Sequence, residues 1–187
     1  LRPETLPALR KLLDHTDPLL RIAALGALDP FEPGARIQAA APLLSDPVRG
    51  VRVEAARLLA DIPDAQFPPD RRDARERALK EYEDSLRMDA DWPSANVNLG
   101  NLQLRQGRID DAIVAFQRAL ALDPQFTGAT LNLADAYRQA GREAEGEKAL
   151  RRGIALTPRQ ADLHHALGLL LVRKGDKPAA LAELALA

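Results

Sequence analysis

The sequence lacks cysteine, is poor in aromatic residues and carries almost no net charge. Without cysteine, the chain cannot use thiolate chemistry, hold an iron–sulfur cluster or attach a c-type haem. Lys and Arg total 26 against 27 Asp and Glu, so no net field draws the chain to nucleic acid or to an anionic membrane. We therefore expect its partners to be recognised by a local surface rather than by overall charge.

Long apolar runs are also missing. The longest, residues 166–172, is far shorter than the roughly 18 residues that a membrane span requires, so we expect no membrane insertion. The sequence indicates a soluble segment and does not distinguish the cytoplasm from the periplasm. Because the chain begins at Leu1 and ends at Ala187 inside a helical pattern, we expect it to be part of a longer protein.

Six columns of residues recur every 34 positions in the second half of the chain, and such a period indicates a repeated supersecondary unit. The clearest columns are Leu99, Leu133 and Leu167, each followed by Gly or Ala, and Gly107, Gly141 and Gly175. Residues 94–106 and 109–122 each place apolar side chains at helical spacing. Gly107 is expected to end the first helix in the left-handed conformation, so each unit is predicted to be a helical hairpin.

The 34-residue period, the Leu-Gly pair, the turn glycine and the closing Asp123-Pro124 resemble the tetratricopeptide repeat. The resemblance implies an all-α fold, a right-handed α-solenoid of antiparallel helix pairs. Residues 71–187 are assigned to these repeats. They comprise a half repeat at 71–91, full repeats at about 93–126 and 127–160, and a truncated repeat at 161–187.

The first 60 residues repeat differently and resemble the short HEAT-like repeat. Asp17 and Asp46 each precede a proline, and Arg21 lies 31 positions before Arg52. Asp at the N-cap and Pro at the first helical position are typical of a helix start, so we expect helices to begin at both places. Residues 61–70 carry three prolines and are expected to form a linker between the two kinds of repeat.

No motif in the sequence indicates catalysis. There is no Gly-rich phosphate loop, no His-Glu-x-x-His pattern and no nucleophile elbow, so we predict a non-enzymatic protein without a cofactor or a metal site. Of the three histidines, His164 and His165 are adjacent and point about 100° apart on a helix, which prevents both from binding one ion. We expect His164 to pack between helices and His165 to face the groove described below.

Four arginines between residues 71 and 77 form a basic cluster near the expected linker. Because Asp73 with Arg77 and Glu76 with Lys80 are spaced for pairing on one helix face, we interpret the cluster as a solvated helix. We predict no nucleic-acid binding through it. Trp92, the single tryptophan, is expected to cover a seam between repeats.

In tetratricopeptide-repeat proteins the first helix of each pair lines a concave groove, so the resemblance implies a peptide-binding site there. Its predicted members are Val97, Asn98, Asn101, Arg105, Leu131, Asn132, Asp135, Arg138, His165, Leu169 and Arg173. Asn98 and Asn132 share one column, and similar Asn columns line the repeat groove of the O-GlcNAc transferase family. An amide side chain can donate to and accept from a peptide backbone. The alternative is that these two amides cap or bridge helices.

The charged residues of the predicted groove narrow the class of ligand that it could bind. The three groove arginines offer forked donors to acidic side chains or to a C-terminal carboxylate. Co-chaperones that grip chaperone tails through a carboxylate clamp carry cations at positions that correspond here to Val97, Asp162 and Ala166. Because those charges are absent, we do not predict a chaperone tail as the ligand.

The sequence therefore predicts a protein–protein interaction scaffold that binds an extended peptide or a partner helix in the groove. The alternative is a docking or assembly tail of a larger exported bacterial multihaem c-type cytochrome protein, because bacterial proteins with a similar order of repeats carry such a tail. The high Arg and Ala content favours a bacterial source. We also expect self-association through the truncated C-terminal end, where Leu181, Leu184 and Leu186 lack a following helix.

Overall fold

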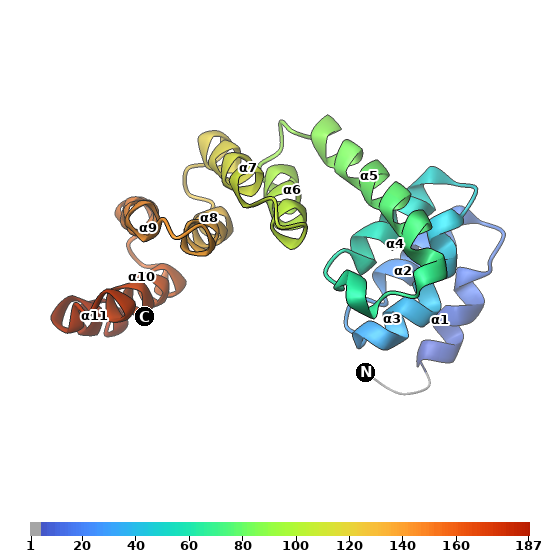
Figure 1. Cartoon of the computed structure of the whole chain (residues 1–187), viewed down its shortest axis with the longest axis horizontal. Coiled ribbons are helices and arrows are strands. Elements are labelled where there is room, and N and C mark those ends of the chain that lie inside the picture. Colours follow the sequence, from blue (N-terminus) through green and yellow to red (C-terminus); the bar gives the residue numbers. More distant parts are fainter. Residues whose placement is uncertain (1–4) are drawn as a thin grey trace. The chain divides into compact units, whose positions relative to one another are not determined.

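The structure, a computed structural model, describes residues 5–187, and the first four residues of the predicted HEAT-like region lie outside this part. The described residues form eleven α-helices and three short 3-10 helices with no strand, which confirms the all-α prediction (Figure 1). They divide into two compact units, one ending at Met88 and the other running from Asp89 to Ala187. No described helix has both the length and the apolar content needed to cross a membrane.

The first unit is built from five α-helices and three 3-10 helices. They are α1 (Thr5–Leu13), α2 (Pro18–Gly26), α3 (Pro33–Ala40), η1 (Ala41–Ser45), α4 (Arg49–Leu59), η2 (Asp64–Gln66), η3 (Pro69–Arg71) and α5 (Arg72–Met88). Asp17 is the N-cap of α2, as predicted, and its carboxylate accepts a hydrogen bond from the backbone N–H of Leu19 at 2.8 Å. Pro18 occupies the first turn, where a missing N–H costs nothing.

The second Asp-Pro pair does not start a helix, which corrects the prediction. α4 begins at Arg49 with Val48 as its N-cap. The carboxylate of Asp46 still accepts from the N–H of Val48, at 2.8 Å, and so organises the turn before the helix. The stretch from Asp46 to Arg52 is two residues longer than the stretch from Asp17 to Arg21. The two extra residues lie in the turn before α4.

Buried arginines connect the helices of the first unit. Arg21 is 8% exposed, and its Nε and Nη2 lie 2.9 and 3.0 Å from the two carboxylate oxygens of Asp46. Arg21 also donates to two backbone carbonyls of the preceding turn, and Arg52 does the same one repeat later. The carboxylate of Glu81 on α5 completes the second arrangement, at 2.9 Å from Nη2 of Arg52. The 31-residue spacing of the two arginines therefore reflects a repeated structural contact.

The predicted linker, residues 61–70, packs into the first unit through two buried side chains. Ile62 and Phe67 are only 3% and 2% exposed. Arg75, which the sequence placed on a solvated helix, is 7% exposed; it donates to the carbonyl of Ile62 at 2.5 Å, pairs with Asp64 and lies 4.7 Å from the centre of the Phe67 ring. The ion pairs predicted on its helix do not form among the described residues. The hydrophobic side chains of the segment explain why its prolines do not make it a free linker.

The division between the units falls later than the sequence indicated. α5 carries the pattern of a tetratricopeptide half repeat, yet it belongs to the first unit and packs against α4. The two compact units are divided after Met88, and the assignment of a linker to residues 61–70 and a half repeat to residues 71–91 stays a prediction.

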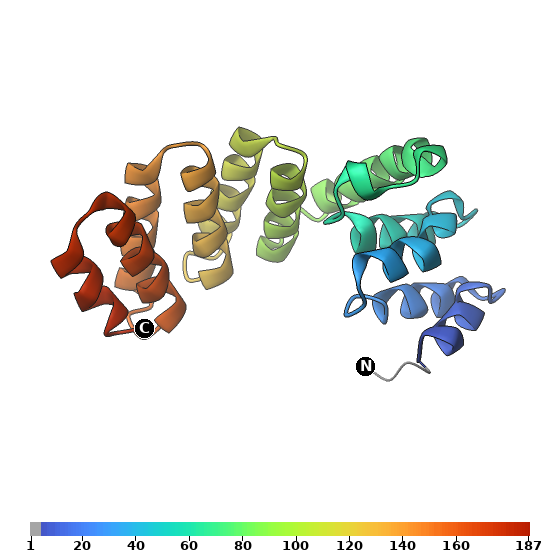
Figure 2. The same cartoon turned by 60° about the horizontal axis from the view of Figure 1, so that its bottom comes forward.

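The second unit consists of three antiparallel helix pairs (Figure 2). They are α6 (Pro93–Arg105) with α7 (Ile109–Leu122), α8 (Thr127–Gln139) with α9 (Glu143–Leu156), and α10 (Ala161–Lys174) with α11 (Lys177–Leu184). Within each pair the turn contains the predicted glycine in the left-handed conformation. The φ angles are 74° at Gly107, 70° at Gly141 and 83° at Gly175, which confirms the turn prediction.

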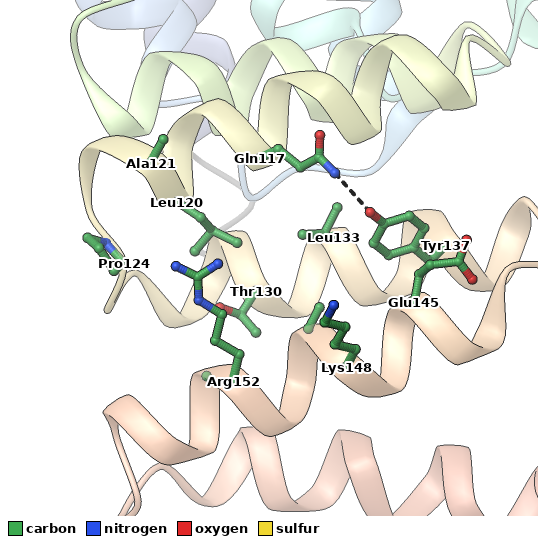
Figure 3. Close-up of a pocket in the computed structure, with 12 residues that line it drawn as sticks. Gln117, Leu120, Ala121, Pro124, Thr130, Leu133, Tyr137, Glu145, Lys148 and Arg152 are labelled. Carbon is green, nitrogen blue, oxygen red and sulfur yellow. Dashed lines mark hydrogen bonds between the residues drawn. The ribbon is translucent and has the colours of Figure 1, made fainter.

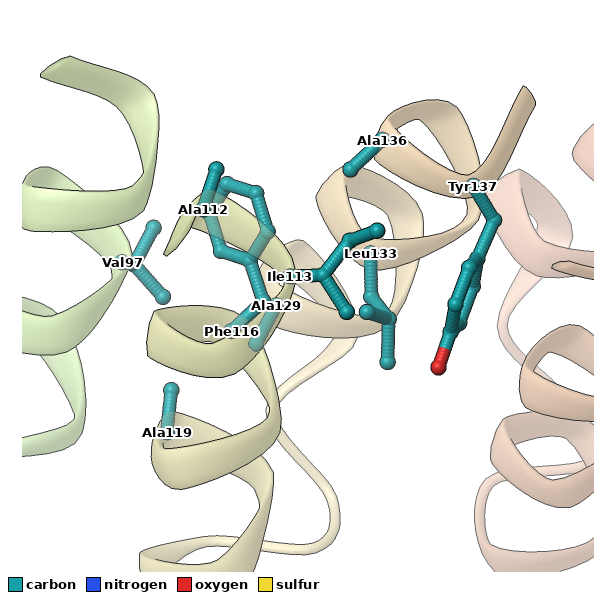
Figure 4. Packing of buried hydrophobic residues seen from close by; sticks show 9 residues of the cluster. All are labelled: Val97, Ala112, Ile113, Phe116, Ala119, Ala129, Leu133, Ala136 and Tyr137. Carbon is teal, nitrogen blue, oxygen red and sulfur yellow. The ribbon is translucent and has the colours of Figure 1, made fainter. Parts of the chain in front are cut away.

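A small residue opposite a large one brings the helices of the first pair together. A Cβ atom added to Gly100 would lie 2.5 Å from the ring of Phe116, whose side chain is fully buried. The ring is part of a core cluster that extends from α6 across α7 to α8 (Figure 4). Its members are Val97, Ala112, Ile113, Phe116, Ala119, Ala129, Leu133, Ala136 and Tyr137.

The second and third helix pairs also place a small residue opposite a larger one. A Cβ added to Gly168 would lie 2.6 Å from Cγ of Leu184, so the third pair also requires glycine at this column. The second pair has Ala134 and Leu150 in the corresponding positions, both in one core cluster. Leu150 leaves room for the methyl group of Ala134, whereas Leu184 lies against Gly168, so the size of the partner alone does not set the residue in this column.

Candidate functional site

The predicted groove residues lie on the first helices of the three pairs. α8 contacts both α6 and α10, so the three helices are neighbours within the second unit. We call their shared side the first-helix face. It carries Asn98, Asn101, Arg105, Leu131, Asn132, Asp135, Arg138, His165, Leu169 and Arg173, all of which are exposed or half-buried.

Val97 does not belong to this face, which corrects the sequence-based site. Its side chain is 9% exposed and packs in the core cluster with Ala112 and Phe116. The equivalent residues of the following repeats, Leu131 and His165, are half-buried and exposed. The column therefore turns outward only from the second repeat on, and Val97 is not available to a ligand.

The amides of the face behave differently from one another. Nδ2 of Asn132 donates to Oδ1 of Asn101 at 3.0 Å, so this pair bridges α8 and α6, as the alternative interpretation expected of Asn132. Asn98 is exposed, and its side chain forms no hydrogen bond among residues 5–187. The bridge leaves Oδ1 of Asn132 and the amide hydrogens of Asn101 for other partners.

The charged residues of the face are partly neutralised within it. Arg138 binds the carboxylate of Asp135 at 2.6 Å, and Gln139 donates to the same carboxylate at 2.7 Å. Arg173 makes a long contact of 3.4 Å with Glu143 on α9. Arg105 is exposed and has no ion pair within the described part of the chain. Of the three arginines that the sequence singled out, Arg105 is therefore the one best able to accept a new carboxylate.

The adjacent histidines separate as expected. His165 is exposed on the first-helix face, whereas His164 is buried at 5% exposure between α10 and α11. Nδ1 of His164 lies 2.7 Å from Oε2 of Glu183, and Nε2 lies 3.0 Å from the carbonyl oxygen of Pro158. The hydrogen bond to Glu183, followed by the one to Pro158, raises the pKa of His164 because both partners stabilise the protonated ring.

Trp92 does not cover a seam between repeats. Its side chain is 68% exposed at the N-terminus of α6, where it is the N-cap residue. Its backbone has the local role instead, because its carbonyl accepts a hydrogen bond from Nδ2 of Asn96 at 2.9 Å.

Among residues 5–187, no three His, Asp or Glu side chains gather closely enough to hold a metal ion.

A pocket of about 490 Å³ lies on another side of the same repeats, between α7, α8 and α9 (Figure 3). α8 contributes Thr130, Leu133 and Tyr137, and the phenol oxygen of Tyr137 accepts a hydrogen bond from Nε2 of Gln117 on α7 at 2.9 Å. At 100° per residue, these positions lie on the side of α8 opposite Asn132 and Asp135. The sequence analysis missed this pocket. The signal available in the sequence was Gly153, which lines the pocket and stands where the first repeat has Ala119.

Comparison with known proteins supports the repeat assignment. Two family models described as tetratricopeptide repeat match the chain, one over residues 70–125 and the other over residues 103–170. Together they span more than half of the chain. No curated protein matches the chain by sequence. The HEAT-like assignment of the first 60 residues stays a prediction, because these family models begin at residue 70.

Solved structures of MamA are similar in fold. One has a TM-score of 0.56 and 24% sequence identity over 92% of this chain and 93% of that one. A second has a TM-score of 0.55 and 22% identity over 99% and 91%. A MamA RS-1 double mutant has a TM-score of 0.56 and 19% identity over 98% and 90%. At these identities the similarity supports the fold alone.

The helix pairs, the left-handed turn glycines and the matching family models agree with one another. They support a protein–protein interaction scaffold as the general role of the chain. Over residues 70–170, the chain belongs to the tetratricopeptide-repeat family.

Proposed function

We propose that the chain is a non-enzymatic scaffold that binds an extended peptide or a partner helix on the first-helix face. The observation that carries this proposal is the unused hydrogen-bonding capacity of the amides on α6 and α8. Asn98 is exposed without a partner among the described residues, and the Asn101–Asn132 bridge leaves a donor and an acceptor free. A peptide backbone offers both complementary groups at every residue.

The charges of the face favour an acidic group in the ligand. Arg105 has no carboxylate partner among the described residues, and the contact from Arg173 to Glu143 is long enough to be exchanged for a better one. Arg138 is committed to Asp135. We therefore assign the ligand contact to Arg105 first, with Leu169, which is 45% exposed, providing apolar surface further along the face.

The experiment is a pull-down from extract of the source cells, followed by mass spectrometry and a binding measurement with the recovered partner. The test variant is Asn98→Ala with Asn132→Ala, and the matched control is Gln125→Ala, which removes an exposed amide from a turn. The proposal requires that the control retain the partner and that the double variant lose it while keeping its helicity. Equal retention by both variants would show that the first-helix face is not the binding surface.

The cytochrome alternative has an independent test. This alternative requires the parent protein to carry haem. An absorption spectrum of the parent protein without a haem band would therefore contradict it. Self-association is tested by sedimentation of the chain at several concentrations. A monomer at all of them contradicts association through α11, where Leu181 is 70% exposed.

A further inference from the structure

A buried polar residue recurs at one column of the three helix pairs. Asn96, Thr130 and His164 lie 34 positions apart and are 2%, 3% and 5% exposed. In the first pair, Nδ2 of Asn96 donates to the carbonyl oxygen of Ala90 at 2.7 Å. In the third, Nε2 of His164 lies 3.0 Å from the carbonyl oxygen of Pro158, also six residues upstream. These two side chains therefore satisfy the same backbone carbonyl in their repeats.

The second repeat lacks this contact. The side chain of Thr130 forms no hydrogen bond among the described residues, although it is almost fully buried. The second partner of His164 is missing as well, because the residue that corresponds to Glu183 is Ala149. Where the third repeat has a histidine and a glutamate, the second therefore has a threonine and an alanine.

The pocket occupies this position. Thr130, Ala149 and Pro124, which corresponds to Pro158, all line it. Its volume of about 490 Å³ is within the range of ligand sites in proteins. Thr130 lines this pocket, and its hydroxyl has no protein partner among the described residues, so it gains one when a ligand with a hydrogen-bonding group enters.

The rim of the pocket adds positive charge. Lys148 and Arg152 are one helical turn apart on α9, and Figure 3 shows their side chains extending toward α7. Both are exposed, and neither forms an ion pair within the described part of the chain. Glu145, the acidic residue of the lining, is already bound to Arg142 at 2.9 Å. The uncompensated charge around the pocket is therefore positive.

We propose that this pocket binds a peptide segment of a partner protein that carries an apolar side chain next to an acidic one. The apolar side chain inserts between α7 and α9 over Leu120 and Leu133, and the carboxylate pairs with Lys148 and Arg152. The hydroxyl of Thr130 bonds a backbone amide of the segment. An amide provides this contact, whereas the hydrocarbon tail of a fatty acid leaves the hydroxyl unpaired.

This site is independent of the first-helix face. Thr130 and Asn132 point to opposite sides of α8, so a ligand in the pocket does not occupy the amides of the other face. A scaffold with both sites holds two different segments at once, one on each side of the same repeats.

The test uses fluorescence anisotropy with the whole chain and two short labelled peptides whose backbone is extended. Both peptides alternate leucine with a charged residue, which is glutamate in one and lysine in the other. We expect binding of the glutamate peptide and none of the lysine peptide. Lys148→Glu with Arg152→Glu is expected to weaken binding about tenfold or more. Arg118→Glu is the matched control, since Arg118 is the equivalent of Arg152 one repeat earlier, is exposed and lies outside the pocket lining.

A second variant fills the pocket with the residues of the next repeat. Thr130→His with Ala149→Glu recreates the pair formed by His164 and Glu183, and it is expected to abolish binding while helicity is kept. Should this variant fail to fold, the charge-reversal variant, which changes only exposed side chains, still decides the question.

Several results would overturn the proposal. They are no binding of the glutamate peptide, equal binding of the lysine peptide, unchanged binding by the charge-reversal variant, and binding of laurate in the pocket with no competition by the peptide. Loss of peptide binding in the Asn98→Ala, Asn132→Ala variant would place the peptide on the first-helix face and would equally overturn it. If the pocket does not bind the peptide, the proposed function of the first-helix face is unaffected.

Discussion

Gly100→Ala tests whether the close approach of α6 and α7 explains why position 100 is a glycine. The new Cβ would lie 2.5 Å from Cε1 of Phe116 and 2.8 Å from two further ring atoms. The ring is fully buried and cannot move into solvent, so the clash is expected to cost about 1 to 3 kcal/mol. Alanine recovers about 0.5 to 1 kcal/mol through its better helix propensity. The two terms together give a net loss of up to about 2.5 kcal/mol.

The second repeat supplies the compensating change. Ala134 is accommodated there opposite Leu150, so Gly100→Ala combined with Phe116→Leu should lose less stability than the two single variants added together. Phe116→Leu alone leaves a void and is expected to cost about 1 kcal/mol or more. A coupling energy of about 1 kcal/mol in this double-mutant cycle would show that the ring of Phe116 is what clashes with the methyl group at position 100.

The assay is urea denaturation followed by circular dichroism, with hydrogen exchange of the α6 and α7 amides to locate the change, because repeat proteins need not unfold in one step. Gly34→Ala is the control. No atom lies within 4 Å of a Cβ at this helical position, so the variant is expected to gain about 0.5 to 1 kcal/mol. If Gly100→Ala were as stable as Gly34→Ala, or if the cycle showed no coupling, the packing argument would be refuted.

Three further outcomes are expected. The stability that protonated His164 gains from Glu183 is present below its ordinary pKa of 6.5 and is lost as pH rises through its raised pKa, so the Tm advantage over His164→Gln should shrink as pH rises above 6.5. An advantage that grows over this range would contradict the assignment. Arg21→Met leaves Asp46 buried without its partner and is expected to lose about 3 to 5 kcal/mol in urea denaturation; a loss below about 1 kcal/mol would mean that the pair behaves as an exposed one. Gly141→Ala puts a side chain on a backbone with φ of 70° and should cost about 1 to 2 kcal/mol, measured as a lower Tm, whereas an unchanged Tm would show that the turn adopts another conformation.

Local patterns predicted the second unit well. The helix expected at 109–122 begins and ends at those residues, and all three turn glycines have positive φ. Both features depend on side-chain periodicity and backbone sterics within a few residues, and the same signals recur three times. The small column at Gly100 was also recognised, because a helix pair repeated at a fixed period reveals which positions face each other.

Burial was harder to predict, and the errors concern single side chains. Arg75 carries a charge and lies in a charged stretch, yet it is buried because residues 61–70 fold over it. Trp92 is large and apolar, yet it is exposed at the start of α6. Val97 sits in a column that faces outward in the later repeats, but it packs in the core with Ala112 and Phe116. For Arg75 and Val97, residues outside the local helix decide burial, and composition says nothing about them.

The amino-acid sequence by itself determined the helix pairs, their 34-residue period, their turns and the family, since these follow from periodic and local interactions. Only the tertiary structure decided where the chain divides, which amides bridge α6 and α8, and where a cavity opens. The pocket lies where Thr130 and Ala149, from two different helices, replace the larger His164 and Glu183 of the next repeat. A void is a property of packed neighbours, so no single residue in the sequence announces it.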